Sequence, residues 1–468
     1  MRALLGIVGL LIFIYLRPHE WWKELANVPM LYIFLGITLV GLGADIAARE
    51  TTFVVGPQLG WAVMFVTWCS LSLLLKIPDQ AGAKLPLLFI CFLLYFLIAH
   101  GLQRVKSLSR VTLVIFASGL FVAFCCVYQA FSPYECVTVD LKNRSGHGFT
   151  RHVKCNVNED KTPSEGITEC ISKGRPGVTY RCERWGLFDT SSIGGGRVRY
   201  LGVLMDPNEC ALATVLAVPF AFSYFERKKT LGRLLLLLFA LGLIGVAVVF
   251  TKSRGGQLVF ATALGAYFVR KFGYRRGIMV AAVMTVPAIA LGGRGGEEAD
   301  QSTIDRLQAA AAAIKMMMAG PLLGAGFTQF TEHHHLTAHN AYLLAVGETG
   351  FPGMVLFVCN IVLAIKVPIA VLRRDLPPTE DMKTAQSLAM ALLATFCGMA
   401  LGIFFLSWTY HYVLWIHFGL AGSLYSVIRA KDKKFKVSLS LKEFGLIVLG
   451  CIAVLVLMTF QIKRKNCW

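Results

Sequence analysis

Charged side chains are scarce in this sequence. Only 16% of its 468 residues are Asp, Glu, Lys or Arg, whereas 56% are hydrophobic. A soluble domain of this length needs more polar surface, so the composition excludes a soluble globular protein. The apolar residues instead form blocks long enough to cross a bilayer, for which a helix needs about 20 residues. Since lipid cannot satisfy open backbone groups, we predict an all-α polytopic integral membrane protein.

Thirteen apolar blocks are candidate spans, which corresponds to about 12 transmembrane helices. Several are shorter than 20 residues, and the first, Leu4–Leu16, is short for a helix that crosses a bilayer. The chain start has a single Arg and no small-residue cleavage site, so we do not expect a cleavable signal peptide. The candidate spans are Leu4–Leu16, Val28–Ile46, Leu59–Leu75, Leu85–His100, Val111–Phe131, Ala211–Phe225, Leu234–Phe250, Gln257–Val269, Ile278–Leu291, Met354–Leu372, Ala385–Leu406, Tyr412–Ile428 and Phe444–Gln461.

Acidic residues are fewer still: 27 stand against 46 Lys and Arg, which gives a net charge of +19. The basic residues are dispersed between spans, which argues against nucleic-acid binding. The span order puts four basic loops on one side, which the positive-inside rule assigns to the cytoplasm. The tail Lys463–Lys465 then lies on the outer side, against that rule. The four loops are Arg104–Arg110, Arg227–Arg233, Arg270–Arg276 and Arg429–Lys436.

This orientation divides the chain into five parts. Residues 1–131, 201–291 and 354–468 are the N-terminal, central and C-terminal groups of transmembrane helices. Residues 132–200 form a polar insert on the outer side, and residues 292–353 form an outer loop and helix.

Four of the 13 cysteines lie together in the polar insert, at Cys136, Cys155, Cys170 and Cys182. Four cysteines in one outer segment predict two disulfides in an oxidising compartment. Three pairings are open, and the alternative is four free thiols or a zinc site. The other nine cysteines lie in or beside spans, where they suit a small core residue.

The first outer cluster comes just before a span and contains Arg197, Arg199 and Asn208. Guanidinium groups bind phosphate in a bidentate way and keep their charge. Pro207-Asn208 is typical of a helix start, whose N–H groups also favour anions. The alternative is that these arginines meet lipid head groups without further function.

The second cluster is Thr251-Lys252-Ser253-Arg254-Gly255-Gly256, in a short outer turn between two spans. Basic residues here run against the positive-inside bias, and the glycines let the backbone approach a ligand. The alternative is an ordinary glycine turn with a snorkelling Arg254.

The third cluster runs from Ser302 to Gly353 and includes Arg306, three consecutive histidines at 333–335, His339 and Asn340. Ser302 and Asp305 predict the start of a short interfacial helix over Asp305–Met318. His339 is a candidate general base for an acceptor hydroxyl, a metal ligand with His335, or a plain interfacial histidine. Metal is the weakest of the three, because no HExxH motif or well-placed carboxylate accompanies the pair.

Together these motifs resemble the O-antigen ligase and polymerase superfamily over roughly residues 195–425. The likeness rests on the order, spacing and shared outer side of the motifs. The segment Leu16–Glu20 resembles a subgroup, the exosortase-associated O-glycosylation ligases. The motifs are Arg199-x-x-Gly202 before Asp206-Pro207-Asn208, Ser253-Arg254-Gly255-Gly256, Arg306 with Pro321-Leu-Leu-Gly324-x-Gly326, and His339-Asn340 before Gly350-x-x-Gly353.

The resemblance implies a glycosyltransferase of the bacterial inner membrane with its active site on the periplasmic side. Such enzymes move a glycan from undecaprenyl diphosphate to a hydroxyl of lipid A core, a growing glycan or a protein, without a metal or other cofactor. Arg199 and Arg254 would hold the diphosphate, with Arg197, Asn208, Lys252 and Arg306 as further binding residues. His339 would act on the acceptor hydroxyl and Asn340 would fix its region.

Two departures from the family pattern stand out. Asp206 occupies a position where a neutral residue is common, and the insert with four cysteines is unlike typical O-antigen ligases.

An anion transporter is the competing hypothesis. Transporters carry ionisable residues near the membrane midplane, whereas these spans are nearly free of charge. Polar residues collect instead at the outer ends of the spans, which favours catalysis at the interface.

Overall fold

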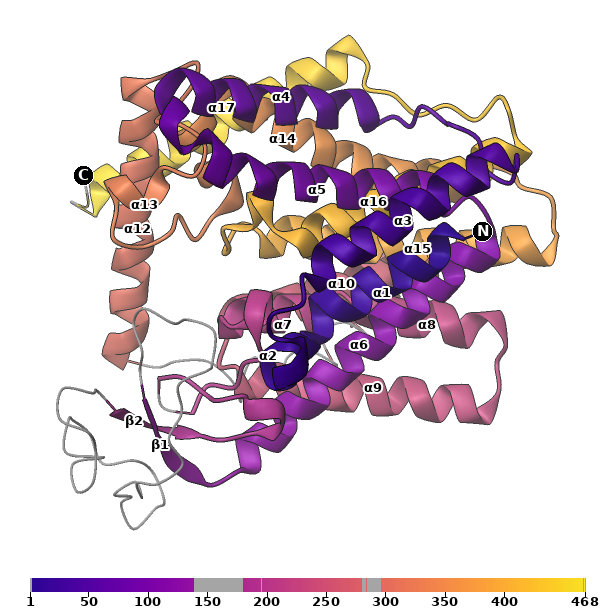
Figure 1. Ribbon diagram of the computed structural model, residues 1–468, viewed down its shortest axis with the longest axis horizontal. Coiled ribbons are helices and arrows are strands. Elements are labelled where there is room, and N and C mark those ends of the chain that lie inside the picture. Colours follow the sequence, from indigo (N-terminus) through magenta and orange to yellow (C-terminus); the bar gives the residue numbers. More distant parts are fainter. Residues whose placement is uncertain are drawn as a thin grey trace.

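The structure is a computed structural model that describes residues 2–138, 180–194, 196–279, 283, 296–465 and 467. Most of its long helices run side by side across Figure 1 and form one bundle. They are α3 (Met30–Ala47), α4 (Leu59–Lys76), α5 (Ala81–Gly101), α6 (Val105–Phe131), α9 (Leu231–Phe250), α10 (Arg254–Phe272), α14 (Ala341–Arg373), α15 (Glu380–Gly402), α16 (Tyr412–Lys431) and α17 (Leu441–Arg464). Shorter members are α1 (Ala3–Leu16), α2 (Pro18–Trp21), α7 (Pro207–Val215), α8 (Val218–Arg227) and α13 (Phe330–His333).

Ten helical stretches in the described part of the chain are long and apolar enough to cross a membrane. They confirm the prediction of a polytopic, nearly all-α membrane protein. Of the other three candidate spans, α1 is a short apolar helix of 14 residues. Helix α10 is a 19-residue helix with charged ends, packed against α15. Almost all of Ile278–Leu291 lies outside the described residues.

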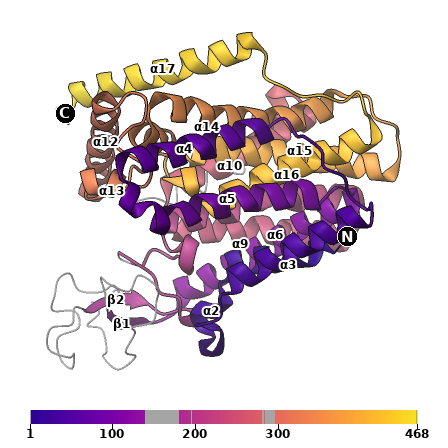
Figure 2. The ribbon, with the colours of Figure 1, turned by 45° about the horizontal axis from the view of Figure 1, so that its top comes forward.

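Burial separates the helices at the centre of the bundle from those at its rim. In α16, 89% of the most apolar stretch is buried within the protein, and in α7–α8 the share is 78%. In α17 the share is only 22%, and Figure 2 shows this helix lying along the outside of the bundle. The rim helices leave large apolar side chains exposed, as expected for surfaces that meet lipid.

The basic loops share one end of the bundle, here called the basic end. Arg227 at the end of α8 bonds to Ser109 near the start of α6. Arg270 reaches the carbonyl oxygen of Leu372 near the end of α14, and Arg374 pairs with Asp432 after α16. With the ion pair of Lys271 and Glu226 between α10 and α8, these contacts join five segments from distant parts of the sequence, as the predicted orientation requires.

The opposite end, here called the α12 end, carries the two predicted outer segments (Figure 1). Helix α12 (Gly296–Ala319) crosses this end at a steep angle to the bundle. It begins before the predicted Asp305–Met318 helix, so Ser302 is not its N-cap: the residue lies inside the helix. The polar and Ala-rich composition of α12 suits a helix that lies across the bundle end.

The described part of the insert forms a small hairpin at the α12 end. Strand β1 (Tyr134–Thr138) pairs antiparallel with β2 (Tyr180–Arg184), and Cys136 is directly opposite Cys182. Their Sγ atoms are 3.8 Å apart, farther than the roughly 2.0 Å of a disulfide bond. Cys155 and Cys170 lie outside the described residues. The predicted disulfide-bearing insert is therefore not confirmed.

Candidate functional site

Helix α7 begins with a capped turn at the α12 end. Pro207 is its first residue, as the sequence predicts, and the carboxylate of Asp206 accepts hydrogen bonds from the backbone N–H groups of Asn208 (2.7 Å) and Glu209 (3.3 Å). The departure at Asp206 thus has a physical consequence. The N–H groups that would attract an anion already bind an internal carboxylate.

Arg197 ties this turn to the start of α10. Its Nε donates to the carbonyl oxygen of Thr251 at 3.1 Å, and its Nη2 donates to Oδ1 of Asn208 at 3.4 Å. The first and second sequence clusters are therefore in direct contact, although 54 residues separate Arg197 from Thr251.

Arg199 is half-buried and anchored to the backbone around it. Its guanidinium donates to the carbonyl oxygens of Ser191 (2.9 Å) and Met205 (3.3 Å) and to Oγ of Ser191 (3.3 Å). Burial lowers the pKa of Arg199, while the carboxylates of Glu183 and Asp206 oppose that shift. Arg199 thus fixes the end of the insert against the start of α7. Three of the five N–H donors of an arginine are used in these bonds, which leaves two.

The start of α10 is also capped by a side chain. Oγ of Ser253 accepts from the N–H of Gly256 at 3.0 Å, while Lys252 and Arg254 on either side are exposed. A Cβ at Gly256 would lie 2.5 Å from Cβ of Ala211, so a glycine is needed for the close contact between α10 and α7. Close packing rather than approach to a ligand explains this glycine.

Phe405 joins the second cluster to the third. The backbone of Gly255 packs on its side chain, where an added Cβ would lie 3.5 Å from the ring. The guanidinium carbon of Arg306 on α12 lies over the same ring, 5.9 Å from its centroid. Arg306 is therefore brought next to the α10 start that carries Arg254. Basic residues of two distant segments thus gather at one position.

His339 lies in the loop between α13 and α14. Its backbone is left-handed, with φ of 47°, and its N–H donates to Oγ of Ser407 at 2.9 Å. The side chain of Asn340 caps α14 by accepting from the N–H groups of Tyr342 (2.9 Å) and Leu343 (3.0 Å). Asn340 therefore fixes the start of α14 directly after His339.

The electrostatic surroundings of His339 include charges of the first and third clusters. Burial lowers its pKa, and the positive charge of Arg306 lowers it further. The carboxylates of Asp206 and Asp305 act in the opposite direction. The charge of Asp206 raises the pKa of both Arg199 and His339. Asp206 thus connects the candidate base with the arginine cluster before α7.

The glycine motifs after α12 hold the His339 loop in place. The N–H groups of Ala325 and Gly326 donate to the carbonyl oxygens of Gly347 and Glu348, and Phe351 donates to Pro321. Gly350, with φ of 71°, kinks α14 at this contact. A Cβ there would lie 2.3 Å from the carbonyl oxygen of Leu322. These motif residues therefore couple α12 to α14 on both sides of His339.

Sequence reasoning missed the loop between α15 and α16 as part of the site. The predicted span Ala385–Leu406 ran through it, whereas α15 ends at Gly402. This loop supplies Phe405 beneath Arg306 and Ser407 beneath His339. Gly402 and Ser407 were the only local signals of a helix end. The contacts of the loop are tertiary and have no sequence signature.

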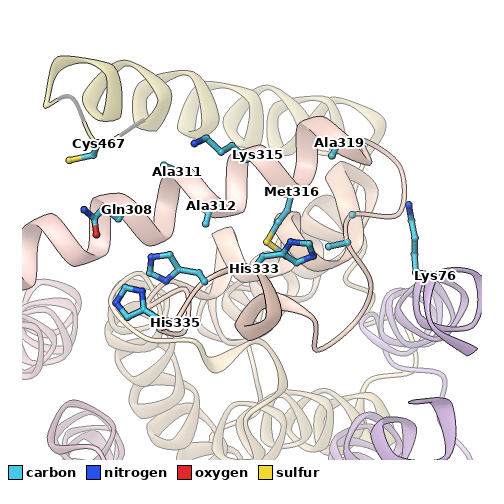
Figure 3. Close-up of a pocket in the computed structure, with 13 residues that line it drawn as sticks. Lys76, Gln308, Ala311, Ala312, Lys315, Met316, Ala319, His333, His335 and Cys467 are labelled. Atoms are coloured by element: carbon cyan, nitrogen blue, oxygen red, sulfur yellow. The ribbon is translucent and has the colours of Figure 1, made fainter. Parts of the chain in front are cut away.

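A groove of about 840 Å³ runs along another part of α12 (Figure 3). Lys76, Lys315 and the three histidines 333–335 line it, together with alanines of α12. The rings of His334 and His335 lie side by side at a tilt of 32°, with centroids 4.5 Å apart. His335 thus belongs to this groove, together with two lysines.

The comparisons with known proteins agree with this arrangement. Residues 236–358 match the family described as O-antigen ligase, a region that runs from α9 into α14. It includes Lys252, Arg254, Arg306, His339 and Asn340. No curated protein matches the chain significantly. The match supports the resemblance drawn from the motifs: residues 236–358 of this multi-pass membrane protein are similar to the O-antigen ligase family.

Proposed function

We propose that this protein transfers a glycan from undecaprenyl diphosphate to a hydroxyl of an acceptor. The acceptor is lipid A core, a glycan or a protein, and the reaction takes place at the α12 end, on the periplasmic face of the bacterial inner membrane. One observation carries the proposal. A half-buried histidine, His339, is held in a strained backbone conformation beside Arg306, in a region where basic residues of three distant segments meet.

The lowered pKa of His339 suits a general base. A histidine that is neutral near pH 7 can accept the proton of an acceptor hydroxyl. The hydroxyl oxygen then bonds to the anomeric carbon while the bond from that carbon to the diphosphate oxygen breaks. The electron pair of the broken bond leaves with the diphosphate. Attack opposite the leaving group inverts the configuration at this carbon.

Arginines suit the other half of the reaction, in which negative charge grows on the leaving diphosphate. Arg254 is exposed at the start of α10, and Arg199 is anchored with two N–H donors remaining. Pre-positioned positive groups near a low-dielectric boundary stabilise such charge without having to reorganise. Lys252, Arg306, Arg197 and Asn208 are proposed to complete the binding region, and no metal or other cofactor is needed for these steps.

The test uses purified protein, a glycan on undecaprenyl diphosphate, a panel of acceptors and a chelator. We expect His339→Ala to lower the transfer rate by about 10²–10⁴-fold, the usual contribution of a general base. Arg254→Ala and Arg199→Ala should each lower it by about 10²–10³-fold. Arg233→Ala, at the basic end, is the matched control and should transfer normally.

Thermal unfolding of each variant shows whether the fold is kept. Two results would contradict the proposal. One is wild-type protein that releases no undecaprenyl diphosphate with any acceptor, after which anion flux in vesicles would test the transporter hypothesis. The other is full transfer by a folded His339→Ala variant.

A further inference from the structure

A second hollow lies at the α12 end, between the chain start and the insert. It has a volume of about 390 Å³ and includes four aromatic side chains and two carboxylates in its lining. They come from α2, α6, β1 and the turn after β2, so residues more than 160 positions apart meet in it. These six are Trp21, Tyr128, Trp185, Phe188, Glu135 and Asp189.

Two of the four rings, Trp21 and Phe188, are fixed by contact with one another and with the bundle. The Trp21 and Phe188 centroids are 4.6 Å apart, and Phe188 also packs on Phe121 of α6 at 5.4 Å. Indole Nε1 of Trp21 donates to the carbonyl oxygen of Leu16 at 3.3 Å. Trp21, Trp185 and Phe188 are each half-buried, so part of each ring surface remains open. The pocket wall is therefore preformed.

The turn that presents Phe188 has an unusual backbone. Phe188 and the next residue, Asp189, both adopt the left-handed conformation, with φ of 56° and 57°. This conformation is strained for a non-glycine residue, and such residues cluster at ligand sites. Two backbone bonds close the turn, from Gly186 to Thr190 at 2.8 Å and from Thr190 to Leu187 at 3.1 Å.

Glu135 and Asp189 supply the carboxylates of the pocket. Within the part of the chain that the structure describes, Oε2 of Glu135 is buried and has no hydrogen-bond partner. Asp189 is exposed at the rim. A flat aromatic wall with a few fixed acceptors suits a sugar, whose C–H face packs on rings and whose hydroxyls donate to carboxylates. Two carboxylates disfavour an anionic ligand.

Membrane anchoring is the other common role of Trp and Tyr near an interface. It explains exposed rings such as Tyr128, which is 49% exposed. It gives no reason for a strained turn, or for a buried carboxylate oxygen in the same hollow.

We propose that this pocket is a binding subsite for uncharged sugar units, hexoses or N-acetylhexosamines. The ligand is part of the glycan handled by the transferase, and to that extent the inference rests on the proposed function. The pocket is separate from His339 and the arginines, and it lies partly in the insert that typical members of the family lack.

Binding is measured first, by calorimetry on the full chain in a detergent without a sugar head group. The probes are tetrasaccharides of N-acetylglucosamine and of glucose, with a galacturonic acid tetrasaccharide as the anionic comparison. We expect at least one neutral probe to bind, and Trp185→Ala and Glu135→Gln each to weaken it about tenfold. Trp185→Tyr should restore most of the affinity. Phe131→Ala removes a ring that is 74% exposed at the end of α6 but lies outside the pocket, so it should change nothing.

The source of the sugar is settled by transfer kinetics with the same variants. A raised KM for the lipid-linked donor assigns the subsite to the donor glycan, and a raised KM for the acceptor assigns it to the acceptor. Either result supports the subsite. Absence of binding by both neutral probes, or binding that survives in folded Trp185→Ala and Glu135→Gln, would overturn it. Because binding needs no turnover, the His339→Ala variant should bind the neutral probes normally. A failure of the transferase proposal can therefore be told apart from a failure of the subsite proposal.

Discussion

At the scale of single residues, two neighbours on α12 act on His339 in opposite directions. Arg306 lowers the pKa of its imidazole, and Asp305 raises it, while burial gives the largest lowering effect. A base is active only when neutral, so protonation should abolish transfer as the pH falls through the pKa of His339. Its lowered pKa places that loss below the ordinary histidine value of about 6.5.

The first prediction concerns the acid limb of the pH–rate profile. Arg306→Gln removes a positive charge, so the pKa of His339 rises and the acid limb moves to higher pH. Asp305→Asn removes a negative charge, so the limb moves to lower pH. The profile of kcat/KM is measured from about pH 5 to pH 8. Limbs that coincide in wild type and both variants would show that His339 is not the titrating group.

The sequence placed these residues at one common end of the spans but could not give their partners. Charge and the order of the spans placed Arg199, Arg254 and His339 together at the outer ends of helices. The three hydrogen bonds of the Arg199 guanidinium, two to backbone carbonyls and one to a serine hydroxyl, depend on how the insert folds back on α7, which no local pattern encodes. The sequence showed that Asp206 departs from the family pattern. The structure shows that its carboxylate caps α7 and so occupies the N–H groups of the first turn.

At the scale of elements, the loop of His339 depends on the helix that follows it. Asn340 supplies the N-cap of α14, and the loop after α15 holds the neighbouring backbone through Ser407 and Thr409. The hydroxyl of Thr409 donates to the carbonyl oxygen of Ala341, the first residue of α14, at 2.7 Å. Loss of the cap should therefore disturb both the stability of α14 and the position of His339.

The second prediction separates these two effects. Asn340→Ala should lower the free energy of unfolding by about 0.5–2 kcal/mol, the usual cost of a lost cap. Thr379→Ala removes the cap of α15, where the Thr379 hydroxyl accepts from the N–H of Met382 at 3.3 Å near the basic end. Unfolding in detergent should show similar losses for both variants. Only Asn340→Ala should reduce transfer, and Asn340→Asp, which keeps a capping oxygen, should restore it. Equal transfer rates for both alanine variants would show that Asn340 does not position His339 for the reaction.

Long apolar runs made most elements readable from the sequence. A run that spans a bilayer in helical form has few alternatives, which is why α3 to α6, α9 and α14 to α17 were predicted. The starts of α12 and α14 were misplaced, because α12 begins in a polar segment and α14 extends well before its apolar run, through the kink at Gly350. Short breaks, such as the one between α7 and α8, are set by packing and not by composition.

At the scale of the whole molecule, the two ends of the bundle differ in chemistry. The basic end carries Lys229 between α8 and α9, and the α12 end carries the histidine groove, which Cys467 also lines. Helix α17 therefore takes the last part of the chain across the bundle to the α12 end (Figure 2). If the α12 end is periplasmic, the basic residues Lys463–Lys465 lie outside despite the positive-inside rule.

The third prediction tests that orientation with a maleimide that cannot cross membranes. Cys467 should react in intact cells, because it is half-buried at an open groove of the α12 end. The variant Cys467→Ser gives the background from the other cysteines. Adding Lys229→Cys to that variant should give new labelling only after the membrane is permeabilised. The reverse pattern would put the basic loops outside and the proposed site in the cytoplasm, where a lipid-linked donor displayed on the periplasmic face could not reach it.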